Sequence, residues 1–347
     1  MFCFRNYKGL SVTTVKTNKL FFLGFIVLLQ YGDAVYGQNI AMPGRYTNAN
    51  YFRDEVVKYN DSVIYGYAKD WKGNEVRLGM TIFFPELSYD SLKRRPLIVL
   101  VHGGSYFHGN KNDMYNEALI LGKRGFVIAC INYRLGWNSS NHSANRWDSS
   151  FYSAIYRSVQ DSNAALRYLV RNAAQYGIDT SWMFIGGTSA GGATALHTAY
   201  YSQSTWDISK PWLRKQLGCI DSSSNKLNDK YTLKGVFDMW GGICDTTYIT
   251  CKAATDIPIL IFHGTADSIV PYTRPQSFEH SRMTPFYGGY LIAQRYKHLD
   301  ACYELNTNIN GRHGADFNAR FLAYKIGVFC KNLLNGECKP AELTLEH

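Results

Sequence analysis

Ser189 is the residue best placed to do chemistry, because it stands in the Gly-Thr-Ser-Ala-Gly stretch of residues 187–191, between an apolar run and a helix-like segment. If this turn is sharp, a side chain at Gly187 or Gly191 would strike the neighbouring strand or helix. A tight glycine turn with a surface serine is the alternative. The strand before the serine and the helix after it favour a nucleophile on an exposed turn.

A serine hydroxyl is a poor nucleophile near neutral pH, so it needs a histidine base and a carboxylate that orients the histidine. Asp267 follows the apolar run 257–262, and His313 follows the run 301–307. We predict that both lie in loops after strands, in the order Ser, Asp, His. Asp161 precedes the serine and is more consistent with a hydrogen bond on a helix.

Backbone amides form the third predicted part of the site. The sequence His-Gly-Gly-Ser at residues 102–105 follows the apolar run 97–101. Glycine lets the backbone approach a substrate oxygen, so the N–H groups of Gly104, Ser105 and Ala190 are predicted to form an oxyanion hole. A plain glycine turn is the alternative for this segment.

The elements that must position these residues are apolar runs alternating with helical patterns. Such alternation predicts an α/β fold, a doubly wound and mostly parallel sheet with helices on both faces. The expected parallel strands are 97–101, 126–131, 182–186, 235–240, 257–262 and 301–307, preceded by antiparallel edge strands at 62–70 and 76–85. The expected helices include 113–125, 158–177, 287–300 and 316–334.

The N-terminus predicts export. Lysines precede the apolar run 20–29, which is short for a membrane span and suits a signal peptide ending near Gly37. An uncleaved membrane anchor is the alternative. The predicted organisation is a signal peptide at 1–37, one domain at 38–338 and a tail with a tag remnant at 339–347, in a secreted or periplasmic protein without a stable membrane anchor.

Composition narrows the class of protein. Charged residues make up 18% and hydrophobic residues 46% of the 347 residues, which argues against a disordered chain or a coiled coil. The formal net charge is +10, but no dense run of Lys and Arg suggests a nucleic-acid partner.

Eight cysteines suit an oxidising compartment. Spacing does not prove their connectivity; the candidate pairs are Cys330–Cys338, Cys244–Cys251 and Cys219–Cys302, with Cys130 a buried thiol. No Cys-x-x-Cys pair or His-x-x-x-His helix suggests a metal site, so we expect neither metal nor cofactor.

Four ordered motifs carry a family resemblance: HGGS, GTSAGG, HGTADSIVP and GRHG. The chain resembles the α/β-hydrolase superfamily, in particular secreted carboxylesterases and lipases of the hormone-sensitive-lipase-like and feruloyl-esterase-like group. Ser105 departs from the common HGGG. The long cap domain of many lipases is missing, and an insertion at about 201–234 is at most a small lid.

The resemblance implies a serine carboxylic-ester hydrolase that forms an acyl-enzyme on Ser189. Its partner is a small-molecule or polymeric ester, and aromatic, plant-wall and polyester esters are the candidate substrates. Tyr106, Phe107 and Trp240 are candidates for an aromatic-accepting cleft, although core packing explains them equally well. Trp137 and Trp147 are further candidates. A serine peptidase of the same fold and a non-catalytic hydrolase-fold binding protein are the alternatives.

Overall fold

The computed structural model describes residues 42–138, 144–273, 286–314 and 317–346, with no side-chain description for 144–148. The predicted signal segment and the side chain of Trp147 lie outside this part. The chain divides into the units Met1–Pro43 and Gly44–His347, and the fold described below is that of the second unit.

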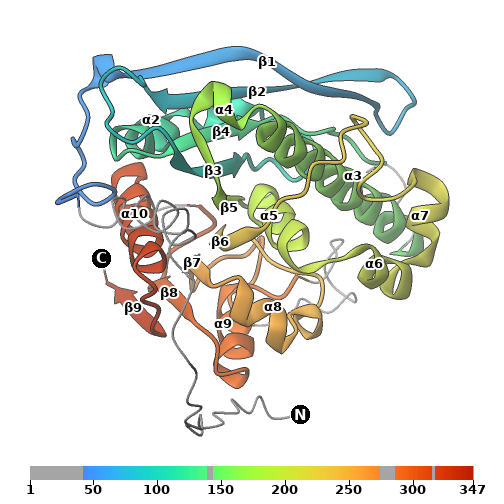
Figure 1. Cartoon of the computed structure of the whole chain (residues 1–347). Coiled ribbons are helices and arrows are strands. Elements are labelled where there is room, and N and C mark those ends of the chain that lie inside the picture. Colours follow the sequence, from blue (N-terminus) through green and yellow to red (C-terminus); the bar gives the residue numbers. More distant parts are fainter. Residues whose placement is uncertain (1–41, 139–143, 274–285, 315–316, 347) are drawn as a thin grey trace, which may run out of the picture. The chain divides into compact units, whose positions relative to one another are not determined.

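Within the described residues, one nine-stranded sheet has the order β1-β2-β4-β3-β5-β6-β7-β8-β9 (Figure 1). The strands are β1 (Val57–Lys69), β2 (Glu75–Pro85), β3 (Arg95–Val101), β4 (Val127–Ile131), β5 (Ile178–Thr188), β6 (Leu233–Met239), β7 (Ile259–Gly264), β8 (Tyr303–Asn308) and β9 (Ala341–Leu345). All eight strands expected from the sequence are present.

The pairing is antiparallel at one edge and parallel through the rest of the sheet. β1 pairs with β2, and β2 with β4, in antiparallel register. From β4 through β3, β5, β6, β7, β8 and β9 every pairing is parallel. The carboxyl ends of the parallel strands therefore meet at one edge, where α/β folds bind ligands.

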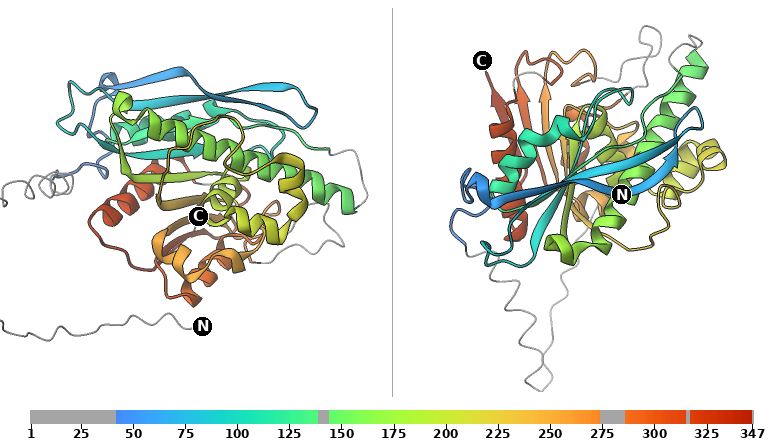
Figure 2. Two further views of the ribbon diagram at one scale, coloured as in Figure 1. Left: turned by 45° about the vertical axis from the view of Figure 1, so that its right-hand side comes forward. Right: turned by 90° about the horizontal axis from the view of Figure 1, so that it is seen from above.

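Helices cover both faces of the sheet (Figure 2), as the sequence predicted. The helical elements are η1 (Asp54–Val56), η2 (Lys111–Met114), α2 (Tyr115–Lys123), α3 (Ala144–Arg171), α4 (Ala173–Tyr176), α5 (Ala190–Tyr200), α6 (Gln203–Ser209), α7 (Pro211–Leu217), η3 (Thr246–Tyr248), α8 (Cys251–Asp256), α9 (Gly289–His298) and α10 (Ala319–Leu334). In the view from above, red α10 and green α3 lie on opposite sides of the strands.

Strand periodicity divides the core into two layers. In β3, Leu97, Val99 and Val101 belong to the cluster that includes apolar residues of α3, α5 and α9. Ile98 and Leu100 belong to the opposite cluster, which includes residues of α2 and α10. Because side chains alternate along a strand while both faces are covered, the strand is apolar throughout.

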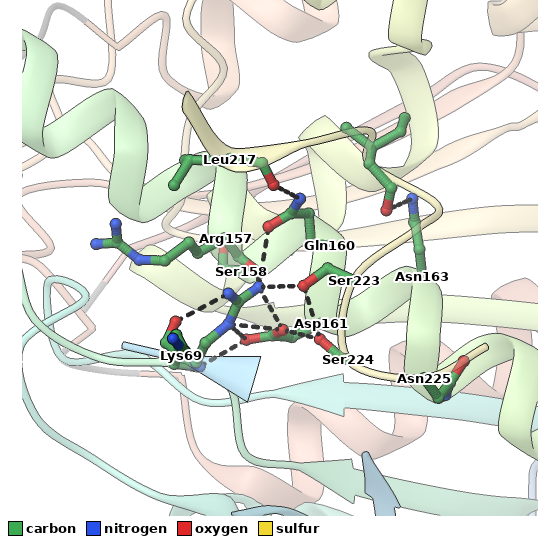
Figure 3. Close-up of polar contacts among 12 residues, drawn as sticks. Lys69, Arg157, Ser158, Gln160, Asp161, Asn163, Leu217, Ser223, Ser224 and Asn225 are labelled. Atoms are coloured by element: carbon green, nitrogen blue, oxygen red, sulfur yellow. Dashed lines mark hydrogen bonds and ion pairs between the residues drawn. The ribbon is translucent and has the colours of Figure 1, made fainter. Parts of the chain in front are cut away.

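The insertion at 201–234 packs on α3. Gln160 Nε2 donates to the Leu217 carbonyl at 2.9 Å, and Asn163 Nδ2 donates to the Ile220 carbonyl at 3.3 Å (Figure 3). Tyr156 adds a hydrogen bond to the Gly218 carbonyl at 2.7 Å. These bonds secure the insertion against the side of the sheet that carries α3.

The predicted C-terminal tail contributes a strand to the sheet. Ala341–Leu345 pairs in parallel with β8 as the edge strand β9. A short strand with exposed side chains is typical of a sheet edge, and its alternating Ala-Glu-Leu-Thr-Leu sequence forms no continuous apolar run.

The suggested disulfide pairs are wrong. Cys302 bonds to Cys338, because the chain turns back after α10 and brings Cys338 to the start of β8. Cys330 faces the core from α10 as a buried thiol, and Cys219 is likewise not disulfide-bonded. The structure does not join Cys244 to Cys251. Cys130 is a buried thiol, as expected.

No helix in the described part of the chain has the length and apolar character needed to cross a membrane.

Candidate active site

Ser189 lies on a strained turn between β5 and α5. Its backbone angles are φ 52° and ψ −118°, outside the regions that a non-glycine residue ordinarily occupies. Its N–H donates to the Met239 carbonyl at 2.8 Å, and its carbonyl accepts from Ala193 at 2.9 Å. These bonds hold the strained residue in place and leave the hydroxyl at the carboxyl edge of the sheet.

The two flanking glycines are required by close backbone contact. A Cβ atom on Gly187 would meet the Val101 carbonyl oxygen and the backbone of Gly191. A Cβ atom on Gly191 would meet that same oxygen and lie 2.6 Å from the His102 carbonyl oxygen. The helix can therefore start this close to β3 only with glycine at both positions.

The structure brings His313 and Asp267 to Ser189. His313 Nε2 lies 2.8 Å from Ser189 Oγ, and His313 Nδ1 lies 2.7 Å from Asp267 Oδ2. Asp267 follows β7 and His313 follows β8, and both of these strands run parallel to β5. Three residues separated by up to 124 positions thus form one hydrogen-bonded chain.

The hydrogen bonds define a consistent protonation state. An ionised Asp267 only accepts, so Nδ1 of His313 carries the proton and donates to it. Nε2 is then a lone-pair acceptor for the Ser189 hydroxyl. This is the arrangement a general base needs before it removes a proton from serine.

Asp267 is held ionised by several donors. Its side chain is fully buried. Burial by itself would raise the pKa of Asp267, but hydrogen bonds from His263 and His313 outweigh burial and bring that pKa below its usual range. The amides of Ile269 and Val270 donate to Oδ1 at 2.8 and 2.9 Å.

The amides of Gly104, Ser105 and Ala190 are available to a ligand. Among the described residues, none accepts a hydrogen bond from these three N–H groups. Gly104 and Ser105 have φ angles of 104° and 54°, so the turn after β3 coils in the left-handed region. Gly103 approaches Ser189 closely, since a Cβ on this glycine would lie 3.3 Å from Ser189 Cβ.

Residues after β4 brace this turn. Trp137 Nε1 donates to the Ser105 carbonyl at 3.0 Å, and the Gly136 amide donates to the Tyr106 carbonyl at 2.7 Å. The Tyr133 hydroxyl donates to the His102 carbonyl at 3.1 Å. Trp137 thus supports the turn through its indole N–H, a role that its position in a polar loop did not reveal.

Ser189 and His313 open onto a cleft of about 620 Å³. The cleft is lined by Gly103, Gly104, Ser105, His108, Gly109, Asp113, Met114, Glu117, Thr188, Ser189, Trp240, Ile269, His313, Gly314 and Phe317. The rings of Trp240 and Phe317 are stacked, with centroids 6.1 Å apart and planes at 10°. They give the cleft an aromatic wall.

Of the aromatic residues suggested for the cleft, Trp240 lines it, whereas Tyr106 and Phe107 do not. Tyr106 is 1% exposed, and its ring packs edge-on against Tyr133 and Phe151 in the core. The backbone at Tyr106 has φ 60°, so the left-handed turn after β3 continues through this residue. Phe107 is half-exposed and lies over Trp137.

Asp161, His102 and His298 lie outside the hydrogen-bonded chain of Ser189, His313 and Asp267. Asp161 forms a buried ion pair with Arg134. His102 bonds the Gly103 carbonyl through Nδ1 at 2.7 Å and stacks on Tyr133. His298 is exposed at the end of α9. Across the ranges that the structure describes, no group of three or more His, Cys, Asp or Glu side chains is arranged so that it could hold a metal ion.

Sequence reasoning missed the cleft residues of η2, α2 and the segment before α10. Met114, Glu117 and Phe317 come from elements that pack together only in the folded chain. Burial raises the pKa of the Glu117 carboxyl. No local motif marks these residues, because their spacing is that of ordinary helix and loop positions.

This fold and this site define an α/β hydrolase. The chain belongs to the BD-FAE family, whose model matches residues 80–254, about half of the sequence. A truncated carbohydrate esterase from gut microbiota has the same fold, with a TM-score of 0.52 and 19% identity over 82% of this chain and 98% of that one.

Two curated relatives are similar over part of their length. A probable isoprenylcysteine α-carbonyl methylesterase from rice is 25% identical over 256 residues, 66% of this chain and 53% of the relative. A probable acetylxylan esterase from Aspergillus fumigatus is 26% identical over 201 residues, 54% of this chain and 50% of the relative. The chain therefore spans about half the length of these relatives.

Proposed function

We propose that this protein is a secreted serine carboxylic-ester hydrolase that cleaves aromatic or plant-wall esters through an acyl-enzyme on Ser189. The observation that carries the proposal is the hydrogen-bonded chain from Asp267 through His313 to Ser189, which ends in the cleft beside three unpaired amides. Nucleophile, base, orienting acid and oxyanion donors are the parts that acyl transfer requires.

In the first step, Ser189 Oγ bonds to the ester carbonyl carbon while its proton passes to His313 Nε2. The carbonyl oxygen becomes an oxyanion and accepts hydrogen bonds from the amides of Gly104, Ser105 and Ala190, each contributing about 3–4 kcal/mol to the transition state. Asp267 stabilises the imidazolium that forms.

Collapse of the tetrahedral intermediate breaks the bond to the alcohol oxygen, which takes the proton from His313 Nε2 as it leaves. A water molecule then attacks the acyl-enzyme and gives its proton to the same nitrogen. The second intermediate releases the acid and returns the proton to Ser189. Apart from the attacking water, each step uses only the side chains and amides of the site.

The substrate class rests on the cleft and on the relatives. Trp240 and Phe317 offer a flat apolar wall for an aromatic acyl group or a sugar ring. An acetylxylan esterase and a carbohydrate esterase among the similar proteins support an ester of plant-wall carbohydrate.

Export is supported by the N-terminal sequence and by the Cys302–Cys338 disulfide, because such bonds persist in oxidising compartments.

The test is a panel of acetyl, butyryl, octanoyl and feruloyl esters and a solid aromatic polyester, assayed with wild type, Ser189→Ala and the exposed control Ser222→Ala. We expect Ser189→Ala to lose turnover and fluorophosphonate labelling, and Ser222→Ala to retain both. Phe317→Leu should lower the ratio of feruloyl to butyryl turnover. An enzyme that prefers octanoyl esters and ignores methyl ferulate would contradict the aromatic substrate, and turnover of peptides alone would favour the peptidase.

A further inference from the structure

His263 is a second histidine at the acid of the proposed catalytic chain. It lies near the end of β7, four residues before Asp267, and its side chain is fully buried. Its Nε2 lies 2.8 Å from the Val270 carbonyl oxygen and 3.2 Å from Asp267 Oδ2. His263 is not among the residues that line the cleft.

The neighbours of His263 determine its tautomer. The amide of Gly289 donates to Nδ1 of His263 at 3.1 Å. A backbone amide only donates, so Nδ1 holds a lone pair and the single ring proton of the neutral imidazole is on Nε2. This N–H therefore donates to the Val270 carbonyl, and because Nε2 also lies 3.2 Å from Asp267 Oδ2, the same proton is shared with the carboxylate.

Two glycines at the start of α9 allow this contact. A Cβ atom on Gly289 would lie 3.0 Å from His263 Nδ1 and 2.7 Å from Ile261 Cγ2. A Cβ atom on Gly288 would meet the Pro271 carbonyl oxygen in the acid loop. The helix N-terminus reaches the imidazole because neither residue has a side chain, which explains the consecutive glycines in the sequence YGGY.

Asp267 is consequently fixed on both oxygens. Oδ1 accepts from the amides of Ile269 and Val270, and Oδ2 accepts from His263 and from His313. A carboxylate with four donors cannot rotate without breaking hydrogen bonds. Other polar groups near the imidazole are Tyr272, with its ring centroid 5.7 Å away, and the buried Asp238 of β6, whose Oδ1 accepts from the Gly241 amide.

We propose that His263 is a positioning residue: its Nε2–H holds Asp267 Oδ2 toward His313, and the Gly289 amide keeps that proton on Nε2. The proposal rests on the catalytic chain of the proposed function. Loss of this donor frees Asp267 to rotate, so the orientation of His313 is lost while the cleft that binds the ester is unchanged. The effect therefore falls on kcat and leaves KM unaltered.

The experiment compares His263→Leu, which removes the donor, with His263→Gln, which keeps an N–H at the end of a side chain of similar reach. His298→Leu, at an exposed histidine, is the matched control. We expect His263→Leu to lower kcat by about 10–100-fold, the range that supporting hydrogen bonds have in metal sites, with KM within about twofold of wild type. His263→Gln should recover most of the loss, and the control should match wild type.

A second readout does not depend on turnover. The His313 Nδ1 proton, shared with Asp267, should give a downfield proton NMR resonance in wild type that shifts or broadens in His263→Leu and returns in His263→Gln. A protein that hydrolyses no ester would overturn the proposed function, while this resonance would still test His263.

Gly289→Ala provides a variant that leaves His263 in place, in case His263→Leu does not fold. The added Cβ displaces the amide from Nδ1, so kcat should fall with KM unchanged and with a melting curve that still shows a cooperative transition. Wild-type kcat and an unshifted resonance in His263→Leu or in Gly289→Ala would refute the proposal, as would an equal loss in His263→Gln and His263→Leu.

Discussion

Asp161→Ala should destabilise the protein strongly without touching the cleft, because Asp161 is the counter-charge of a buried arginine. The side chains of Asp161 and Arg134 are 0% and 5% exposed. The carboxylate accepts from the Arg134 backbone amide at 2.8 Å, from Arg134 Nε at 2.9 Å and from the Ser224 hydroxyl at 2.6 Å. Figure 3 shows Asp161 and Ser224 in this network.

The size of the expected loss of stability follows from the contacts that Arg134 keeps in Asp161→Ala. Arg134 keeps acceptors on Lys69, Gln160 and Ser223, but it loses its only charged partner within this network. Burial, together with repulsion by Arg134, already lowers the pKa of the neighbouring Arg157 to about 10. Breaking a buried ion pair typically costs about 3–5 kcal/mol. Because the change leaves two adjacent buried guanidinium groups, we expect the free energy of unfolding to fall by about 4 kcal/mol, which lowers Tm by roughly 10 °C.

The assay is urea unfolding followed by circular dichroism, with ester turnover measured on the folded protein. Asp256→Ala is the matched control, since Asp256 pairs with Lys252 one helical turn away and both side chains are more than half exposed, and it should lose less than about 1 kcal/mol. Arg134→Met combined with Asp161→Leu should recover most of the loss, because it removes both charges. The reasoning fails if Asp161→Ala stays within about 1 kcal/mol of wild type, or if the control loses as much.

Three further predictions concern other parts of the fold. Gly191→Ala should lower kcat at least about 100-fold, since its Cβ must displace the turn that carries Ser189; wild-type turnover would contradict the steric argument. Burial lowers the pKa of His197 from 6.5 to about 4. Because the unfolded chain takes up this proton first, the free energy of unfolding should fall by about 3 kcal/mol as the pH drops from 6.5 to 4. The free energy of unfolding of His197→Gln should depend less on pH across that range than that of wild type. An equal pH dependence in the two proteins would exclude this histidine as the cause. Replacing Cys302 and Cys338 together by Ser should cost about 4 kcal/mol, because the disulfide joins positions 36 apart; denaturant unfolding that matches wild type would contradict this.

Most of the sheet could be predicted from the sequence because buried parallel strands are apolar on both faces. The runs at β3, β4 and β7 each stand out against polar neighbours. β9 could not be predicted in this way, since its residues Ala-Glu-Leu-Thr-Leu alternate apolar and polar and form no continuous apolar run. The partner of Cys338 escaped prediction for a related reason: it depends on where the chain turns after α10, and spacing along the sequence carries no such distance.

The three residues of the proposed catalytic chain could be named from the sequence alone, because a strained strand–helix turn demands glycine beside the serine, and chain order restricts the candidate acid and base. The tertiary structure decided what surrounds them. Tyr106 faces the core and Phe317 faces the cleft because backbone direction and helix packing orient each side chain. His263 reaches Asp267, and Gly289 sets the tautomer of that histidine, only because β7 and α9 pack together. Local sequence encodes strain and order along the chain, whereas contacts between distant elements exist only after folding.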